Sequence, residues 1–252
     1  MKTRNALAPS GNPAHQSYAG NSSPHQNSSP NHLKNLESLA TIIRCHRGQE
    51  ICRQGRPAET WYCLLSGAAR RYVIRLDGRR QIVDLLLPGD CFGFTADAEY
   101  DFAVEAVTDQ TVVAGYPRER AEMLADSDPR VSREIRQAAF EALSRLQSQL
   151  LIVGRVTALE KVGSFILKML ARSSRAGSRR VALPVSRYDI ADYLAVSVET
   201  VSRSLTDLKH RGVIRLSGTR TVEIMNLEAL EDGETLTHLR PACNMARHHG
   251  TA

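Results

Sequence analysis

Residues 186–205 read SRYDIADYLAVSVETVSRSL, and this stretch predicts two helices joined by a tight turn. Ser186 can cap the first helix, because its hydroxyl can accept a hydrogen bond from a backbone N–H of the first turn, and Asp189 completes a capping box. The turn falls at Ala195, and Ser197 can cap the second helix in the same way. The stretch therefore predicts a helix-turn-helix.

The second of these helices separates an apolar face from a polar one. The apolar face carries residues about one turn apart, namely Val201, Leu205 and Leu208. The polar face presents Glu199, Ser202 and Arg203 near the N-terminal end, where a recognition helix reaches the edges of DNA bases. Arg can bind guanine through two hydrogen bonds, and Glu can accept one from cytosine. We predict that these three residues read bases; the alternative is an amphipathic helical hairpin with a surface Glu–Arg pair.

The chain carries a formal net charge of +6, and its basic residues concentrate around this motif. Residues 157–226 hold twelve Lys and Arg against six Asp and Glu, so this segment alone matches the net charge of the whole chain. Such a basic surface suits phosphate contact, although an ordinary solvated surface can have the same charge. The residues predicted to contact the DNA backbone are Ser186, Arg187, Ser197, Thr200, Lys209 and Arg220.

Short elements surround the motif on both sides. Two apolar runs at 213–216 and 221–224 flank a Ser-Gly-Thr-Arg turn and predict a β-hairpin, the expected wing of a winged helix. A further helix is predicted at 158–172. Residues 1–31 are rich in Asn, Ser, Pro, Gly, Gln and His, and the C-terminal end shows no periodicity. Both ends are therefore predicted to be unstructured tails.

From residue 42 to residue 116 the sequence changes to short apolar runs between glycines. Asp77-Gly78 and Pro88-Gly89-Asp90 are strong turn sequences, because glycine adopts a positive φ readily and proline restricts the backbone. Strands at a spacing of about 8–12 residues with turns between them predict a small β-sandwich or barrel. The predicted fold class is therefore α+β, with an all-β domain followed by helices.

One long helix is predicted over residues 128–156, with Asp128 as its cap and Pro129 at its first position. Its apolar stripe is narrow and rich in small residues, which favours a seam between two copies of the chain. The alternative is a helix that packs on its own β domain. The residues predicted to form the dimer seam are Ile135, Ala139, Ala142, Leu146 and Val153.

Several classes of protein are disfavoured by the sequence. The number of cysteines is odd, and no two of them have a C-x-x-C spacing, so they predict neither a disulfide framework nor a metal site. The five are Cys45, Cys52, Cys63, Cys91 and Cys243. No run approaches the ~20 apolar residues of a membrane span, and no secretory signal begins the chain. No G-x-S-x-G, P-loop, G-x-G-x-x-G or H-E-x-x-H motif indicates an enzyme. We therefore expect a cytoplasmic protein that uses no cofactor, metal or membrane.

The residues quoted above also resemble a known family. VETVSR at 198–203 is similar to the recognition helix of the Crp/Fnr superfamily of bacterial regulators, and YDIADYL at 188–194 resembles its FixK-type branch. DGRRQ at 77–81 and LPGDCFGF at 87–94 resemble the same branch. The resemblance covers about residues 40–230 and implies an N-terminal β-roll (a double-stranded β-helix or jelly roll), a long dimerisation helix and a C-terminal winged helix-turn-helix. The implied division is 1–31 tail, 32–127 β-roll, 128–156 dimerisation helix, 157–230 winged helix-turn-helix and 231–252 tail.

The same resemblance implies a function. Members of this kind bind double-stranded DNA as homodimers, contact RNA polymerase and activate genes for low-oxygen respiration or nitrogen fixation, here at a TTGA-N6-TCAA-like palindrome. The resemblance implies that Glu199, Ser202 and Arg203 contact the bases. Val198 stands where the cyclic-AMP receptor branch has an arginine, which argues against the operator of that branch.

Two departures from the wider superfamily concern its sensors. The cysteine cluster that holds an iron–sulfur centre in Fnr is absent, because no cysteine precedes Cys45. The segment that binds the cyclic phosphate in cyclic-AMP binders, residues 93–104 here, contains no arginine and several acidic residues, so cyclic AMP is not expected to bind. The alternative is an effector- or redox-responsive regulator whose β-roll binds an unidentified small molecule, with Cys45 or Cys91 as the redox-active residue.

Overall fold

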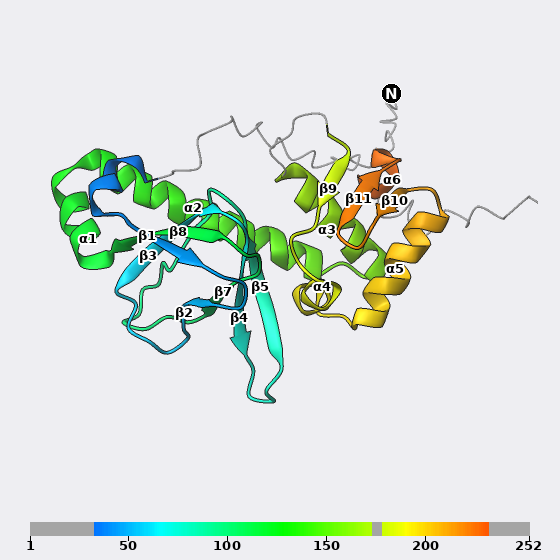
Figure 1. Ribbon diagram of the computed structural model, residues 1–252, viewed down its shortest axis with the longest axis horizontal. Helices are drawn as coiled ribbons and strands as arrows, with labels where there is room; N and C mark the ends of the chain where they lie inside the picture. The colour runs from blue at the N-terminus through cyan, green and yellow to red at the C-terminus, as the bar shows by residue number, and fades with distance from the viewer. Residues whose placement is uncertain (1–32, 173–177, 232–252) are drawn as a thin grey trace, which may run out of the picture.

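The computed structural model describes residues 33–172 and 178–231, and it consists of two units connected by one long helix (Figure 1). The predicted N-terminal tail, Cys243 and the predicted C-terminal tail beyond Glu231 lie outside the described residues. No helix among the described residues is long and apolar enough to cross a membrane.

The N-terminal unit is a roll of two four-stranded antiparallel sheets, with strand orders β1-β8-β3-β6 and β2-β7-β4-β5. The predicted turns are present, since Gly78 and Gly89 both have positive φ, at 78° and 96°. The apolar core between the two sheets includes Leu64, Leu86 and Phe92, each fully buried. The predicted β-roll is thus confirmed. Its strands are β1 (Thr41–Cys45), β2 (Glu50–Cys52), β3 (Thr60–Ser66), β4 (Ala69–Ile74), β5 (Arg80–Leu86), β6 (Cys91–Phe92), β7 (Ala103–Ala106) and β8 (Thr111–Pro117).

Three helical segments cover the outside of the roll: η1 (Lys34–Leu39), α1 (Arg118–Ser127) and α2 (Pro129–Val153). As predicted, α2 begins at a proline, and the Asp128 side chain caps it by accepting a hydrogen bond from Arg130 N at 2.8 Å. Leu36, Tyr116 and Val131 pack together where η1, β8 and α2 meet. The short helices η1 and α1 were not predicted from the sequence.

The residues of the predicted dimer seam differ in burial within the single chain. Ala142 is buried within its own chain, and Ile135 packs against the apolar cluster of η1, α1 and the roll. Ala139, Leu146 and Val153 are half-buried. Within one chain, Ile135 and Ala142 thus contact other parts of the same molecule, and the dimer seam stays a prediction. Helix α2 has two apolar stripes, and periodicity alone does not tell which of them faces the roll.

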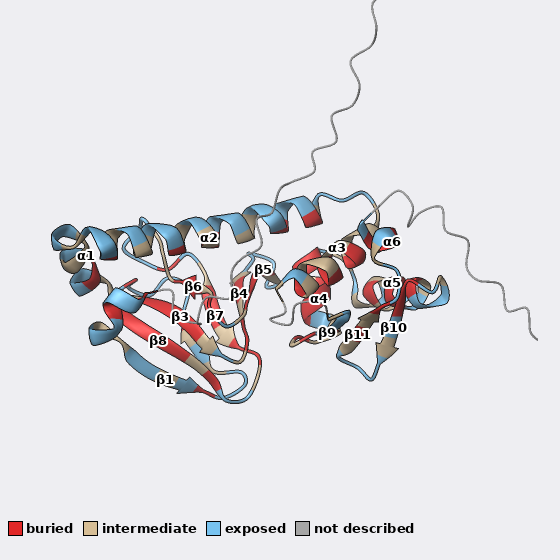
Figure 2. Cartoon of the chain, turned by 90° about the horizontal axis from the view of Figure 1, so that it is seen from above, coloured by how far each residue is buried: buried red, intermediate tan, exposed pale blue. Residues whose placement is uncertain are grey.

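The second stripe of α2 faces outward, and Figure 2 shows this outer side of the helix as exposed. Phe140, Leu143, Leu150 and Leu151 are exposed by 57%, 50%, 73% and 72%. Phe140, Leu143 and Leu150 are separated by three and then seven residues, which keeps them on one side of a helix. An apolar stripe of this kind is unusual on a free surface.

The C-terminal unit holds the predicted helices and hairpin. A three-stranded sheet of order β10-β11-β9 packs beside the helices, and Phe165, Leu194 and Leu208 are buried between them. The same apolar cluster includes Tyr72, Ile82 and Leu85 of the roll, so one core spans both units. The elements are α3 (Ala158–Ala171), β9 (Arg180–Ala182), α4 (Arg187–Leu194), α5 (Val198–His210), β10 (Ile214–Ser217), β11 (Thr221–Ile224) and α6 (Leu227–Glu231).

Two of the cysteines, for which we predicted no disulfide framework, form a disulfide. Cys63 on β3 and Cys91 on β6 face each other across the antiparallel pair and are bonded. Cys45 and Cys52 are free and buried. The expectation of no disulfide was therefore wrong for this pair, because 28 residues separate the two cysteines in sequence and only the strand pairing brings them together.

A cluster of charged side chains is enclosed between the roll and helices α2 and α3. Arg145 on α2 pairs with Asp84 on β5 at 3.1 Å (Nε–Oδ2). Lys168 on α3 donates to the hydroxyl of Tyr193 at 2.8 Å and to the carbonyl of Arg145 at 3.2 Å. Burial and then the neighbouring arginines lower the pKa of Lys168 to about 8.

This lowered pKa gives a pH dependence of stability. Between pH 8 and 10.5 the unfolded chain binds the Lys168 proton more tightly than the folded chain, so this group makes folding more favourable as pH rises. We expect Lys168→Met to remove a gain of about 1 kcal/mol between pH 7 and 9. Urea unfolding of the wild type and of Lys168→Met at pH 7 and pH 9 measures this gain in the free energy of unfolding. Two stability curves that stay parallel across this range would contradict the assignment.

Candidate nucleic-acid interface

The first helix of the predicted motif, α4, is fixed at its N-terminus by a capping box. The Ser186 hydroxyl accepts from Asp189 N at 3.2 Å, and the Asp189 carboxylate accepts from Ser186 N at 3.0 Å. Ile190 and Leu194 point into the core, as predicted. These contacts determine where α4 begins and which side of it is buried.

The turn and the second helix also follow the prediction. Ala195 ends α4 in the left-handed conformation, with φ of 53°, which makes the sharp turn. Ser197 then caps α5 by accepting from Thr200 N at 3.1 Å. Val201, Leu205 and Leu208 are buried on its inner face. The opposite face of α5 is consequently turned to solvent.

The three predicted base readers lie together on this outer face. Glu199 and Arg203 are exposed and Ser202 is half-buried. The Ser202 hydroxyl accepts a hydrogen bond from Arg187 Nη1 at 3.3 Å, which connects the start of α4 to the middle of α5. The side chains are therefore within one helical turn of each other at the N-terminal half of α5, on a surface that the described chain leaves uncovered.

The charge of Glu199 is favoured by its position at the helix start. Its own backbone amide, the Ser197 hydroxyl and the positive charge of Arg203 together lower the pKa of the Glu199 carboxyl. The carboxylate is therefore ionised at neutral pH and can accept a hydrogen bond. This is the protonation state that base reading through cytosine N4 requires.

The predicted backbone contacts lie around this face in different environments. Lys209 and Arg220 are exposed, and Arg187 and Thr200 are half-buried. The hydroxyls of Ser186 and Ser197 already accept capping hydrogen bonds, so they lie at helix N-termini, where backbone N–H groups attract phosphate. Arg220, on the hairpin between β10 and β11, also lines a pocket of about 90 Å³ at the junction with the roll. All six contacts remain predictions.

Comparison with known proteins identifies both units. Residues 42–128 match the family model of the cyclic nucleotide-binding domain, and residues 160–232 match that of the Crp-like helix-turn-helix domain. The nitrogen fixation regulation protein FixK of Rhizobium meliloti is 40% identical over 183 residues, which are 73% of this chain and 82% of that protein. The chain belongs to the FixK-type branch of the Crp/Fnr family.

Further relatives agree with this FixK-type assignment. The transcriptional activator protein FnrL of Cereibacter sphaeroides is 32% identical over 205 residues, covering 79% of this chain and 82% of that protein. The solved structure of FixK2 from Bradyrhizobium japonicum superimposes with a TM-score of 0.71 at 38% identity, over 77% of this chain and 96% of that one. The predicted arrangement of β-roll, long helix and winged helix-turn-helix is therefore that of a solved FixK-type protein.

The interior of the β-roll holds an arginine that the sequence argument did not consider. Residues 93–104 contain no arginine, but Arg71 on β4 is only 8% exposed. Its guanidinium carbon lies 4.7 Å from the ring centre of Phe102. Burial is the main cause that lowers the pKa of Arg71, and the nearby charge of Asp84 opposes it. Among the described residues, no group of His, Cys, Asp and Glu is arranged to hold a metal ion.

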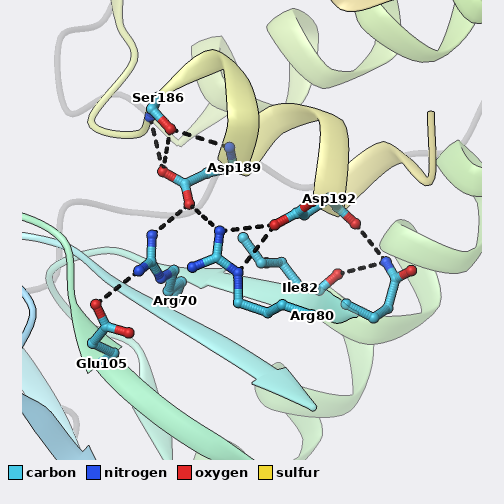
Figure 3. Close-up of polar contacts among 8 residues, drawn as sticks. Arg70, Arg80, Ile82, Glu105, Ser186, Asp189 and Asp192 are labelled. Atoms are coloured by element: carbon cyan, nitrogen blue, oxygen red, sulfur yellow. Dashed lines mark hydrogen bonds and ion pairs between the residues drawn. The ribbon is translucent and has the colours of Figure 1, made fainter. Parts of the chain in front are cut away.

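A second set of residues that sequence reasoning missed connects the roll to the helix-turn-helix (Figure 3). Arg70 on β4, with Arg80 and Gln81 at the start of β5, contacts Asp189 and Asp192 on α4. We call these five residues the interdomain network. The only sequence signal for this network was the resemblance of residues 77–81 to FixK-type proteins. That resemblance does not indicate which residues Arg80 contacts.

Proposed function

We propose that this FixK-type protein is a transcription activator that binds a TTGA-N6-TCAA-like palindrome as a homodimer, in the cytoplasm, and controls nitrogen fixation or anaerobic genes. The observation that carries the proposal is the uncovered outer face of α5, where Glu199, Ser202 and Arg203 stand together on a capped helix. The name of the relative FixK, a nitrogen fixation regulation protein, supports nitrogen-fixation genes as targets, and the name of the transcriptional activator protein FnrL supports activation. RNA polymerase is the expected partner of a bound activator.

The first test is fluorescence anisotropy of the purified protein, without added effector, on a TTGA-N6-TCAA duplex and on a scrambled duplex at one salt concentration. Selective binding would support the proposal, and it would mean that the chain needs no cyclic AMP. Equal weak binding to both duplexes would contradict the operator or the effector-free activity.

The base readers are tested by Arg203→Ala. We expect this variant to lose about 1–3 kcal/mol of operator preference per half-site while weak binding to any DNA survives, because the phosphate contacts stay. Lys209→Ala is the matched control: it should weaken binding to both duplexes equally and reduce the slope of log affinity against log salt by about one unit per subunit. An unchanged operator-to-scrambled ratio in Arg203→Ala would rule out Arg203 as a reader.

The homodimer is proposed to form along the outward stripe of α2, Phe140, Leu143 and Leu150, with a second copy covering it. Two such helices can pack their exposed apolar stripes against each other, as in a coiled coil. We expect the double substitution Leu143→Glu and Leu150→Glu to yield monomers in sedimentation velocity. Met123→Glu, which changes an equally exposed apolar residue on α1, should leave the dimer intact. A variant of the α2 stripe that still sediments as the wild type would show that the interface lies elsewhere.

A redox-responsive regulator is the second candidate function, because the Cys63–Cys91 disulfide lies beside α2. The Cys91 carbonyl accepts a hydrogen bond from Arg145 Nη2 at 2.9 Å, so the bonded strand contacts the helix proposed to form the dimer. Reduction by a dithiol would convert the disulfide to two thiols and oxidise the dithiol to its own disulfide.

For a purely structural bond, reduction should lower the free energy of unfolding by about 3 kcal/mol, because a loop of about 28 residues is released, and leave operator affinity unchanged. Urea unfolding and anisotropy, with and without tris(2-carboxyethyl)phosphine, measure both quantities. A several-fold change in operator affinity, reproduced by Cys63→Ala with Cys91→Ala and absent in Cys45→Ala, would favour the redox-responsive function instead.

A further inference from the structure

The interdomain network forms a dense set of charged contacts between the roll and α4. Arg80 Nη2 lies 2.8 Å from Asp192 Oδ2 and 3.0 Å from Asp189 Oδ1, and Arg80 Nε donates to Asp192 Oδ2 at 3.0 Å. Arg70 bonds Asp189 through Nη1 and is held on its other side by Glu105 at 2.7 Å. Gln81 donates to the backbone carbonyl of Asp192. Side chains and main chain of α4 are thus both bound to the roll.

These contacts are largely withdrawn from water. The side chain of Asp189 is 6% exposed, that of Arg70 16% and that of Arg80 26%. Burial by itself would raise the pKa of Asp189, but hydrogen bonds from Ser186 and the charges of Arg70 and Arg80 outweigh burial and lower the pKa. Hydrogen bonds between charged groups at such partly buried positions hold their geometry better than pairs on an open surface.

The network acts on Asp189, which also completes the capping box of α4. Asp189 accepts from Ser186 and from both arginines, so the start of α4 and the edge of the roll share one carboxylate. In Figure 1, α4 lies between the roll and α5. The turn at Ala195 and the bond from Arg187 to Ser202 then relate the orientation of α4 to that of α5. The reading face of α5 remains uncovered.

We propose that Arg70 and Arg80 of the β-roll are positioning residues for DNA reading, an inference that rests on the proposed function. Through Asp189 and Asp192 they hold α4, and hence α5, in a fixed orientation without any bound effector. The two recognition helices of a dimer must enter half-sites about one helical turn of DNA apart. A winged helix free to rotate on the roll would have to be ordered at the moment of binding, which costs affinity for the palindrome.

Asp192→Asn separates this role from a simple charge effect. Removal of a negative charge from a DNA-binding unit should strengthen its attraction to all DNA phosphates. The positioning role predicts the opposite for the operator: roughly tenfold weaker binding, as expected for loss of a charged hydrogen bond, with scrambled DNA bound as well as before or better. Operator binding that is unchanged or tighter in Asp192→Asn would overturn the inference.

Arg80→Gln provides the matching change on the roll, with Arg79→Gln as its control. Arg79 is the neighbouring residue with the same charge, but its side chain is 80% exposed and pairs with Asp77 within the hairpin. We expect Arg80→Gln to weaken operator binding roughly tenfold with an unchanged salt slope, and Arg79→Gln to have no such effect. If both duplexes weaken equally and the slope falls by about one unit, Arg80 contacts phosphate and the inference fails.

A double variant and a measurement without DNA complete the test. Arg80→Gln combined with Asp192→Asn removes both ends of the same pair, so the fold-loss of operator affinity should be clearly smaller than the product of the two single fold-losses; a full product would count against the inference. In the DNA-free protein, Asp192→Asn should accelerate hydrogen exchange in α4 and β5, and unchanged exchange would overturn the positioning role. If the wild-type protein does not prefer the operator, the proposed function is refuted. The hydrogen-exchange measurement then still decides whether the network holds α4.

Discussion

The carboxylate of Asp189 occupies the point where the two units of the molecule meet. It completes the capping box of α4 with Ser186 and at the same time receives Arg70 and Arg80 from the roll. A buried carboxylate is costly unless it is paired and hydrogen-bonded, and here all of its partners come from these two sources. One carboxylate thus belongs both to the start of α4 and to the contacts between the two units.

An apolar core supports the same junction. Tyr72, Ile82 and Leu85 of the roll belong to one cluster with Tyr193 and Leu194 of α4, so the charged contacts lie next to buried apolar surface. Apolar burial contributes most of the free energy of such a contact but is not directional. The arginine–carboxylate pairs have defined geometry, and they supply the orientation that apolar contact lacks.

Helix α2 serves both units through its two stripes. Its inner stripe covers the roll, and its half-buried Arg145 pairs with Asp84 and donates a hydrogen bond to the strand of the disulfide. Its outer stripe is exposed, and we propose that a second copy of the chain covers it. In a FixK-type protein with no cysteine before Cys45 and no arginine in residues 93–104, we propose that contacts inside the chain itself set the DNA-reading geometry.

The sequence by itself determined the helix-turn-helix, the wing, the β-roll and the outward position of Glu199 and Arg203. Each follows from local rules of capping, turn formation and periodicity, which act over a few residues, and from a resemblance concentrated in the same motifs. Only the tertiary structure decided which stripe of α2 faces the roll, that Cys63 bonds Cys91, and that Arg80 contacts Asp192. These pairs lie 28 to more than 100 residues apart in sequence, and no local preference encodes which distant residue will be a neighbour once the strands have paired and the two units have packed.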